Sequence, residues 1–193
     1  MHLSVDELRA KVEEFRESGL TTQQIADELS LSQTTVQWLS ASDYEVDEKP
    51  QDVKVGWRSI AVKGDRIDAV SYIMCDIIEE MIGDDVDTIV GVSINGIAFA
   101  QSVSSMMSLE LSIVRSISED VSGHLSQVYS NVDGKRVVII DDVYSSGTTM
   151  KKTSADLSAA GADVKMCMVL VNKSWDDDVE GVPLRALVRA ATV

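Results

Sequence analysis

The stretch VVIIDDVYSSGTT, residues Val137–Thr149, decides the fold. It runs from four apolar residues through two acids into a short loop of serine, glycine and threonine. The apolar run predicts a strand that is buried on both faces of a sheet. The small residues after it let backbone N–H groups surround a phosphate where the next helix begins. The carboxyl end of a strand is also where an open α/β sheet binds its ligands.

Other strands and helices alternate on both sides of this stretch. Apolar runs predict strands over residues 88–93, 111–116, 136–141 and 164–171. Helical spacing predicts helices over residues 66–82, 97–107 and 148–160. Strands without polar alternation, separated by helices, are typical of a parallel sheet with helices on both faces, so we expect an α/β fold.

The first 42 residues predict a small all-α domain. Apolar residues recur at helical spacing through residues 5–15, and further helices are expected over 22–29 and 33–39. The pattern resembles a helix-turn-helix unit, with Ser30 at the turn position where that unit usually has glycine. The third helix presents polar groups that can bond base edges and phosphates in a major groove. The expected DNA-binding residues are Ser32, Gln33, Thr34, Thr35 and Gln37.

An acidic segment that contains Pro50 separates the two parts of the chain. We therefore predict a helix-turn-helix domain over residues 1–42, a linker over 43–52 and the α/β domain over 53–193. The N-terminus lacks the features of a signal peptide, and no segment reads as a membrane span, so a cytoplasmic protein without a membrane partner is expected. The two cysteines are isolated from each other and from the histidines, which excludes a disulfide framework and a Cys/His zinc site.

The charge balance limits how the chain can bind nucleic acid. It has 193 residues, 45% of them hydrophobic, and a formal net charge of −15. That hydrophobic fraction excludes a disordered chain. The excess of acid excludes a DNA binder that works by charge alone, because such binding depends on releasing counterions from phosphates. We expect binding through base contacts and dimer geometry, with a shallow dependence on salt, in a salt-rich cytoplasm.

The stretch Val137–Thr149 resembles the phosphoribosyl-pyrophosphate (PRPP) motif of the type I phosphoribosyltransferases. The resemblance implies that fold for residues 53–190, and a phosphoribosyl ligand. Paired acids suit the ribose hydroxyls, which they can hold directly or through a Mg²⁺ ion that comes with the ligand. The implied ligand-binding residues of the motif are Asp141, Asp142, Ser145, Ser146, Gly147, Thr148 and Thr149.

Two further segments resemble this family. The segment GVSINGIAFA, residues 91–100, resembles the pyrophosphate loop of the orotate enzymes and adds Ser93, Ile94, Asn95 and Gly96 to the expected site. Ile94 and Asn95 depart from the family's pattern, which usually has threonine and two glycines, but asparagine tolerates the positive φ of such a loop. Arg115 ends a predicted strand, where the family has an arginine that opens a mobile loop over the active site.

The segment that follows Arg115 lacks the cations that catalysis would require. The orotate enzymes carry lysines there to stabilise the departing pyrophosphate, a role whose loss typically costs ~3 kcal/mol or more. Residues 116–131 contain no lysine or arginine, and they include Glu119 and Asp120. His124 is the one ionisable group in the segment that can become cationic. We therefore expect no catalytic residues, although type I enzymes can borrow a lysine from a partner subunit.

In its order and lengths the chain resembles the archaeal orotate-phosphoribosyltransferase-like regulators, the GfcR family. That resemblance implies a transcriptional regulator of genes of central sugar catabolism, which senses PRPP or a related phosphorylated ribose or nucleotide. A homodimer or higher homo-oligomer on palindromic double-stranded DNA is expected. Two alternatives stay open: an active orotate or purine phosphoribosyltransferase with an autoregulatory DNA-binding head, and a ligand sensor whose head contacts protein. The natural ligand, and the choice between activation and repression, also stay open.

Overall fold

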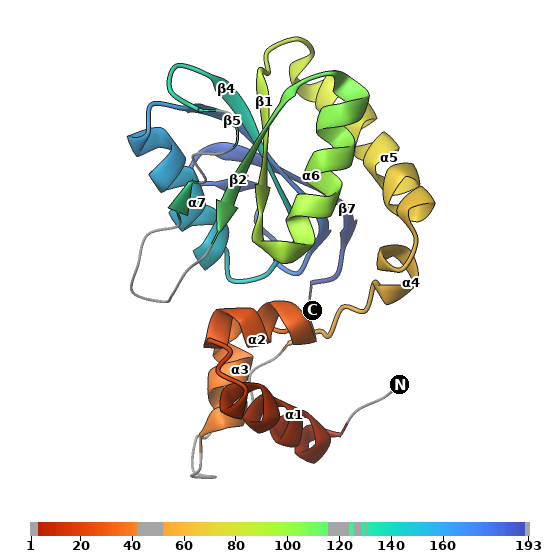
Figure 1. Ribbon diagram of the computed structural model, residues 1–193, viewed down its shortest axis with the longest axis vertical. Helices are drawn as coiled ribbons and strands as arrows, with labels where there is room; N and C mark the ends of the chain where they lie inside the picture. Colours follow the sequence, from red (N-terminus) through yellow and green to blue (C-terminus); the bar gives the residue numbers. More distant parts are fainter. Residues whose placement is uncertain (1–3, 42–51, 116–123, 126–128, 130, 192–193) are drawn as a thin grey trace.

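The computed structural model describes residues 4–41, 52–115, 124–125, 129 and 131–191 of the chain. They form two parts, which we call the head (residues 4–41) and the body (residues 52–191). Figure 1 shows the head beneath the body, with helix α2 facing it. Each part has its own apolar core. The predicted linker falls almost entirely outside the described residues, so the domain boundaries remain a prediction.

The head consists of three short helices: α1 (Val5–Glu17), α2 (Thr22–Leu29) and α3 (Gln33–Ser40). Each begins at a hydroxyl side chain that accepts a bond from a backbone N–H of the first turn, which supplies a partner that the helix itself cannot provide. The caps are Ser4, Thr21 and Ser32. Ser30 takes the left-handed backbone of the turn with φ of 52°, as expected from its position.

The body is built on a seven-stranded sheet in the order β3-β2-β1-β4-β5-β7-β6. Strands β2, β1, β4, β5 and β7 are parallel, while β3 and β6 are antiparallel to their neighbours at the two edges. The strands are β1 (Thr88–Val92), β2 (Glu110–Arg115), β3 (His124–Leu125), β4 (Arg136–Tyr144), β5 (Asp163–Asn172), β6 (Asp178–Val179) and β7 (Val182–Arg189).

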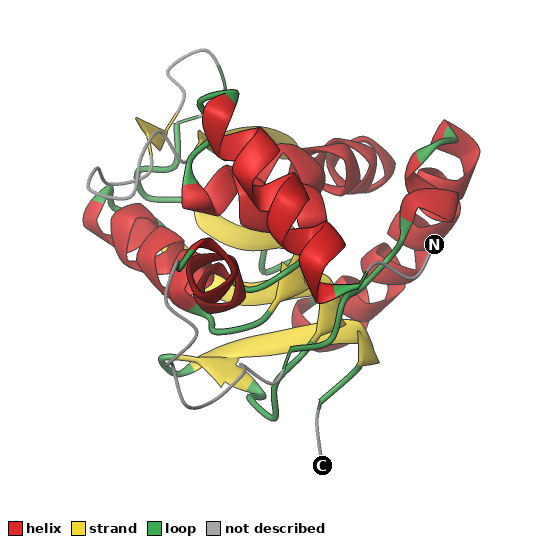
Figure 2. Ribbon diagram, turned by 90° about the horizontal axis from the view of Figure 1, so that it is seen from below, coloured by secondary structure: helices red, strands yellow, loops and turns green. Residues whose placement is uncertain are grey.

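Helices cover both faces of this sheet, and Figure 2 views the arrangement from the side of the head. The helices of the body are α4 (Arg58–Ala61), α5 (Gly64–Ile82), α6 (Ser93–Met107) and α7 (Thr148–Ala159). Because side chains alternate along a strand, Val138 and Ile140 pack against α5 and α6. Val137 and Ile139 point to the opposite face and pack with α7. The predicted α/β fold, with a largely parallel sheet and helices on both faces, is therefore confirmed.

The structure departs from the sequence prediction at several elements: the short elements α4, β3 and β6 were not predicted, and two larger differences follow. Strand β7 was missed, because its apolar residues are interrupted by Pro183 and Arg185. The segment expected to form a pyrophosphate loop is the first turn of α6, which begins at Ser93 rather than near residue 97, and its binding role stays a prediction. The positive φ falls on Ser93, at 59°, and not on Asn95. Within the described residues, no helix is long and apolar enough to cross a membrane.

Candidate functional site

The two acids of the motif lie near the carboxyl end of β4, at the edge of the sheet that faces the head (Figure 1). Both are buried, with 7% of their surface exposed. One oxygen of Asp141 accepts bonds from the Ser93 hydroxyl at 3.0 Å and from the backbone N–H of Asp142 at 2.9 Å. The Trp57 indole N–H donates to Asp142 at 2.9 Å. These bonds fix both carboxylates in place.

This fixed arrangement leaves the acids short of positive charge. Burial, together with the neighbouring carboxylates of Asp142 and Asp27, raises the pKa of Asp141 well above its ordinary value. Burial also raises the pKa of Asp142, and the bond from Trp57 offsets only part of that rise. A proton, a hydroxyl donor or a cation brought by a ligand would therefore stabilise this pair of carboxylates.

The loop that follows the acids leads into α7. Gly147 has a left-handed backbone with φ of 74°, and a Cβ there would lie 2.4 Å from the Tyr144 hydroxyl, so no larger residue fits. The described residues include no side chain that caps α7, unlike the three head helices. Apart from the Thr148 N–H, which donates to the Ser146 hydroxyl at 3.5 Å, the first-turn amides have no side-chain partner among the described residues, so they and the positive end of the helix dipole can meet a phosphate. Ser146 and Thr148 add exposed hydroxyls, which lie 3.0 Å apart.

Tyr144 supports this loop from beneath, a role that the sequence did not predict. Its ring is buried, and its hydroxyl donates to Asp176 at 2.9 Å. Burial first, and the Asp176 carboxylate second, raise the pKa of Tyr144. The tyrosine therefore stays neutral and acts as a donor, which holds it against Gly147.

The other residues expected at the ligand site are less closely grouped. Gly96 lies against β4, where a Cβ would come within 2.6 Å of the Ile140 carbonyl oxygen and 2.8 Å of the Asp141 Cα. Ile94 is 81% exposed, and Asn95 donates to the head rather than to the loop. Arg115 ends β2, where it pairs in register with His124 of β3. The side chains of both, and most of residues 116–131, lie outside the described structure.

The predicted DNA-binding residues lie at the start of α3, but not all of them face outward. Thr34 and Gln37 are exposed. Thr35 is buried, and its hydroxyl donates to the Asp52 carboxylate at 2.8 Å. The backbone N–H of Ser32 donates to the same oxygen at 2.8 Å, and Gln33 bonds to Gln23 of α2. In this conformation, the beginning of α3 is therefore engaged within the chain.

Helix α2 lies over the loop Ser145–Thr149, a contact that no local sequence pattern predicted. The Thr149 hydroxyl donates to the Gln23 side-chain oxygen at 3.2 Å, and the Asn95 amide donates to the Asp27 carbonyl oxygen at 3.4 Å. A cavity of about 60 Å³ remains between the head and the loop. Its lining includes Asp27 from the head, and no lysine or arginine among the described residues.

The carboxylate of Asp27 also interacts electrostatically with the two acids of the motif, Asp141 and Asp142. Burial raises the pKa of Asp27 from its ordinary 3.8 to about 6, the bond from Gln23 lowers it in part, and the charge of Asp142 adds to the rise. The bond from the Gln23 amide to Asp27 measures 3.0 Å. The described residues contain no cluster of three or more His, Cys, Asp or Glu side chains arranged to hold a metal ion. Mg²⁺ would therefore need oxygens from a ligand in addition to Asp141 and Asp142.

Comparison with known proteins connects this geometry to two kinds of relative. Residues 56–185 match the family model described as phosphoribosyl transferase domain. The chain is 40% identical over 193 residues to the transcriptional regulator GfcR of Thermoplasma acidophilum, covering 98% of each chain. It is 37% identical to the transcriptional regulator GfcR of Picrophilus torridus, covering 98% of this chain and 99% of the relative. Adenine phosphoribosyltransferase from Thermoanaerobacter pseudethanolicus shares the fold, with a TM-score of 0.61 and 16% identity over 74% of this chain and 91% of that one.

Proposed function

Since this chain belongs to the GfcR family of transcriptional regulators and carries a phosphoribosyl transferase domain, we propose that its body senses PRPP or a related phosphorylated ribose or nucleotide. The observation that carries the proposal is the uncapped start of α7, which follows Gly147 and lies next to the buried acids Asp141 and Asp142. A phosphate gains bonds from the amides there, while the acids suit ribose hydroxyls.

We propose that different groups of residues bind the phosphate, the ribose hydroxyls and the remaining charge of the ligand. Ser145–Thr149 hold the phosphate through amides and hydroxyls. Asp141 and Asp142 hold the ribose hydroxyls, either directly or through Mg²⁺ bound to the ligand. The first turn of α6, with Ser93, Ile94, Asn95 and Gly96, borders the same edge of the sheet. Arg115 is proposed to meet the remaining negative charge of the ligand.

The head is proposed to bind double-stranded DNA through the start of α3. Its residues Ser32–Thr35 and Gln37 are uncharged, so they read base edges rather than collect phosphates. A homodimer places two such helices about one turn of DNA apart, so the operator is expected to be a palindrome. The target genes are proposed to be those of central sugar catabolism, and chromatin immunoprecipitation with sequencing tests that assignment.

The body is proposed to bind its ligand without turning it over. Stabilising a departing pyrophosphate requires positive charge at the site, and none of the described residues that line the cavity carries it. A coupled assay for pyrophosphate release with PRPP, Mg²⁺ and either orotate or a purine base tests this. Turnover near ordinary enzyme rates, about 1–1,000 s⁻¹, would instead establish the transferase with a DNA-binding head.

The sensing role is tested by calorimetry with PRPP and Mg²⁺ on the full chain. We expect binding that is weakened at least tenfold by Thr148→Val with Thr149→Val, because both hydroxyls are lost while the side-chain shape is kept. Thr153→Val on the same helix is the matched control, since Thr153 is buried away from the loop. No measurable heat with PRPP, ribose 5-phosphate or a nucleotide would remove this ligand class.

A further inference from the structure

The head occupies the entrance of the candidate ligand pocket. Pockets for small molecules typically measure ~300–1,000 Å³, whereas about 60 Å³ remains between α2 and the phosphate loop. That space holds a few water molecules and no sugar phosphate. Ser146 and Thr148 stay exposed, but a phosphorylated ribose that engages Thr149 and the buried acids together has to displace the head from this position.

The same position engages the start of the DNA-reading helix. Ser32 and Gln33 line the cavity between head and body, and Thr35 is tied to Asp52. Asp52 in turn forms a buried ion pair with Lys173 of the body, whose side chain is 3% exposed. Because the first residues of a recognition helix must enter the major groove, DNA also requires the head to leave this position.

Gln23 joins the two functions in one side chain. Its oxygen accepts from Thr149 of the ligand loop and from Gln33 of the recognition helix, and its amide donates to Asp27. Asp27 brings a third carboxylate towards Asp141 and Asp142. The docked position therefore brings groups of like charge together. A ligand that bonds to Thr149 also removes one of the bonds between the head and the body.

The contact between the head and the body is also of a composition that allows the two parts to separate. The apolar core of the head shares no residue with the two apolar cores of the body. The bonds that cross between head and body are polar: Asn95 donates to Asp27, Thr149 donates to Gln23, and Ser32 and Thr35 donate to Asp52, which the ion pair with Lys173 holds within the body. Contacts of this composition permit relative motion of two domains.

We propose that the docked head is a latch on the phosphoribosyl pocket, so that a phosphorylated ligand and operator DNA both bind the released form and each strengthens binding of the other. The sign of this coupling follows from linkage: two ligands that select the same form of a protein must favour each other equally. The proposal rests on the sensing role above, and it deepens that role by giving the direction of the response.

The test measures operator affinity by fluorescence anisotropy at fixed salt and Mg²⁺, with and without saturating PRPP. The operator is selected from randomised duplexes by the full-length wild-type protein. We expect PRPP to tighten DNA binding at least about tenfold, which corresponds to a head that is docked in roughly nine molecules of ten.

Lys173→Met tests the latch without touching either binding site. Loss of the ion pair should release the head, so the variant binds DNA about tenfold more tightly without PRPP, and PRPP adds little. Lys165→Met is the matched control, because Lys165 lies near the start of β5, the strand that ends just before Lys173, and pairs with Asp85 and Asp163. It should behave as the wild type. Gln23→Ala, at a half-buried position between head and body, should also tighten DNA binding without PRPP, and it replaces Lys173→Met if that variant folds poorly by circular dichroism.

The outcomes separate the latch from the sensing role. If PRPP binds by calorimetry but weakens or does not change operator affinity, the latch is wrong and the ligand assignment stands. If neither the wild type nor Lys173→Met binds PRPP, the ligand assignment fails. The latch is then judged by DNA alone: equal operator affinity of Lys173→Met, Gln23→Ala and the wild type would overturn it. Small-angle scattering adds a direct readout, since release should enlarge the radius of gyration.

Discussion

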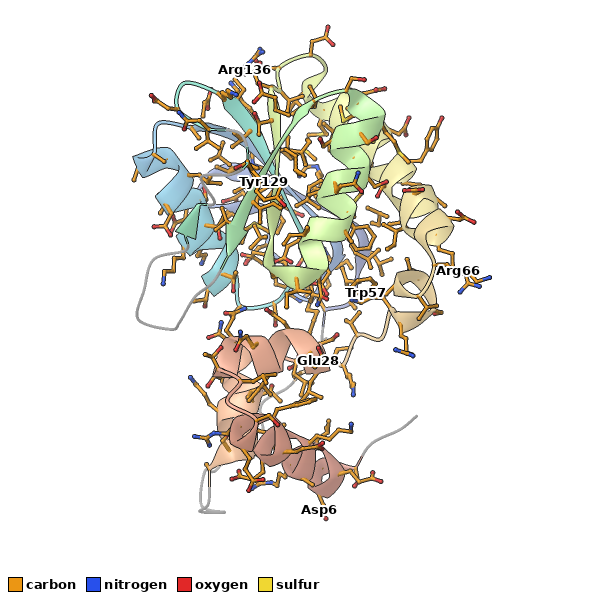
Figure 3. All side chains as sticks on the ribbon, viewed as in Figure 1. Asp6, Glu28, Trp57, Arg66, Tyr129 and Arg136 are labelled. Carbon is orange, nitrogen blue, oxygen red and sulfur yellow. The ribbon has the colours of Figure 1, made fainter. Side chains whose placement is uncertain are left out.

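The sheet has aspartates at both ends of its parallel strands, and those at the amino ends are in the opposite electrostatic state to those at the carboxyl ends. At the edge where the strands begin, Arg136 pairs with Asp85 at 2.8 Å and with Asp87 at 2.6 Å. Bonds from Lys165 and Arg136 lower the pKa of Asp85, and those from Arg136 lower the pKa of Asp87. At the edge where the strands end, burial and like charge raise the pKa of Asp141. Figure 3 shows Arg136 at the end of the body far from the head and Trp57 at the end near it.

The difference separates acids that serve the fold from acids that serve a ligand. The exposed pairs at the strand starts are neutralised within the chain, so they gain little from any further partner. The buried acids at the strand ends are held by Ser93 and Trp57, with no cation among the described residues that line the cavity. Buried carboxylates without a nearby cation lower the stability of the folded protein. Carboxylates with pKa values raised in this way are found mainly at functional sites.

Asp141→Asn should give the largest effect. The amide oxygen can still accept from Ser93, so local geometry is kept while the charge is lost. PRPP affinity in Mg²⁺ should fall ~100-fold, because a lost bond to a charged group costs up to ~3 kcal/mol. The melting temperature should rise, because repulsion from Asp142 and Asp27 is relieved. Calorimetry and thermal unfolding measure the two quantities.

The matched change at the other edge is Asp85→Asn. It should lower the melting temperature and leave PRPP affinity unchanged, because Asp85 pairs with Arg136 and Lys165. If Asp141→Asn instead loses stability and keeps full PRPP affinity, the contrast between the two edges is wrong.

Gly96→Ala should be the next largest effect. A Cβ at Gly96 would meet backbone atoms of Ile140 and Asp141 at 2.6 and 2.8 Å, which cannot yield without moving α6. We expect a loss of about 2–3 kcal/mol in unfolding free energy. At the opposite edge, Gly134 has φ of 70° in open space, so Gly134→Ala should cost about 1 kcal/mol through backbone strain alone. Urea unfolding compares them, and equal losses would show that the strand-end edge is not tightly packed.

Asp27→Asn should change how stability depends on pH. The groups that face Asp27 are Gln23 on its own helix, Asp141 and Asp142 on β4, and Asn95 on α6. Because the pKa of Asp27 is about 6 in the folded protein and 3.8 ordinarily, its folded state holds a proton that the unfolded state has lost. Stability from this group is therefore full below about pH 4, falls as the pH rises through 6, and stays low above it.

The variant should accordingly be more stable than the wild type at pH 7, by about 1–2 kcal/mol once the remaining exposure of Asp27 is allowed for. The difference should vanish near pH 4. Asp85 and Asp87 behave in the opposite way, because their pKa values are lowered in the folded protein: they stabilise it at neutral pH, and this stabilisation is lost as the pH falls below about 4. Unfolding curves at pH 4, 5.5 and 7 test this, with Glu28→Gln on the exposed face of the same helix as control. A constant difference across that range would contradict the buried position of Asp27.

The sequence was most informative where structure follows from neighbouring residues. The apolar run before Asp141 predicted β4, and the helical spacing of apolar residues predicted the three helices of the head. The type I fold followed from the motif, while the binding roles of its residues remain predictions. Contacts between distant residues left no local pattern: Trp57 bonds Asp142, and Asp27 lies near the same acid 115 positions away.

Ambiguous composition accounts for the error at residues 93–96. Small residues after a strand are typical of a phosphate loop, and they are equally suited to a helix start that must pack closely on a sheet. The close approach of Gly96 to β4 explains why the helix starts at Ser93, and only the folded structure contains that distance.

Arg136→Met should have the smallest effect and the strongest dependence on salt. It leaves the exposed carboxylates of Asp85 and Asp87 with less positive charge nearby, so the melting temperature should fall slightly in 50 mM salt. In 1 M salt the deficit should shrink, because the Debye length falls to ~3 Å and exposed charges are screened. The gain from Asp27→Asn should persist under the same conditions, since buried charges are screened much less. If both differences respond equally to salt, then the acids at the two edges do not differ in burial, and the distinction between structural and ligand-binding acids loses its physical basis.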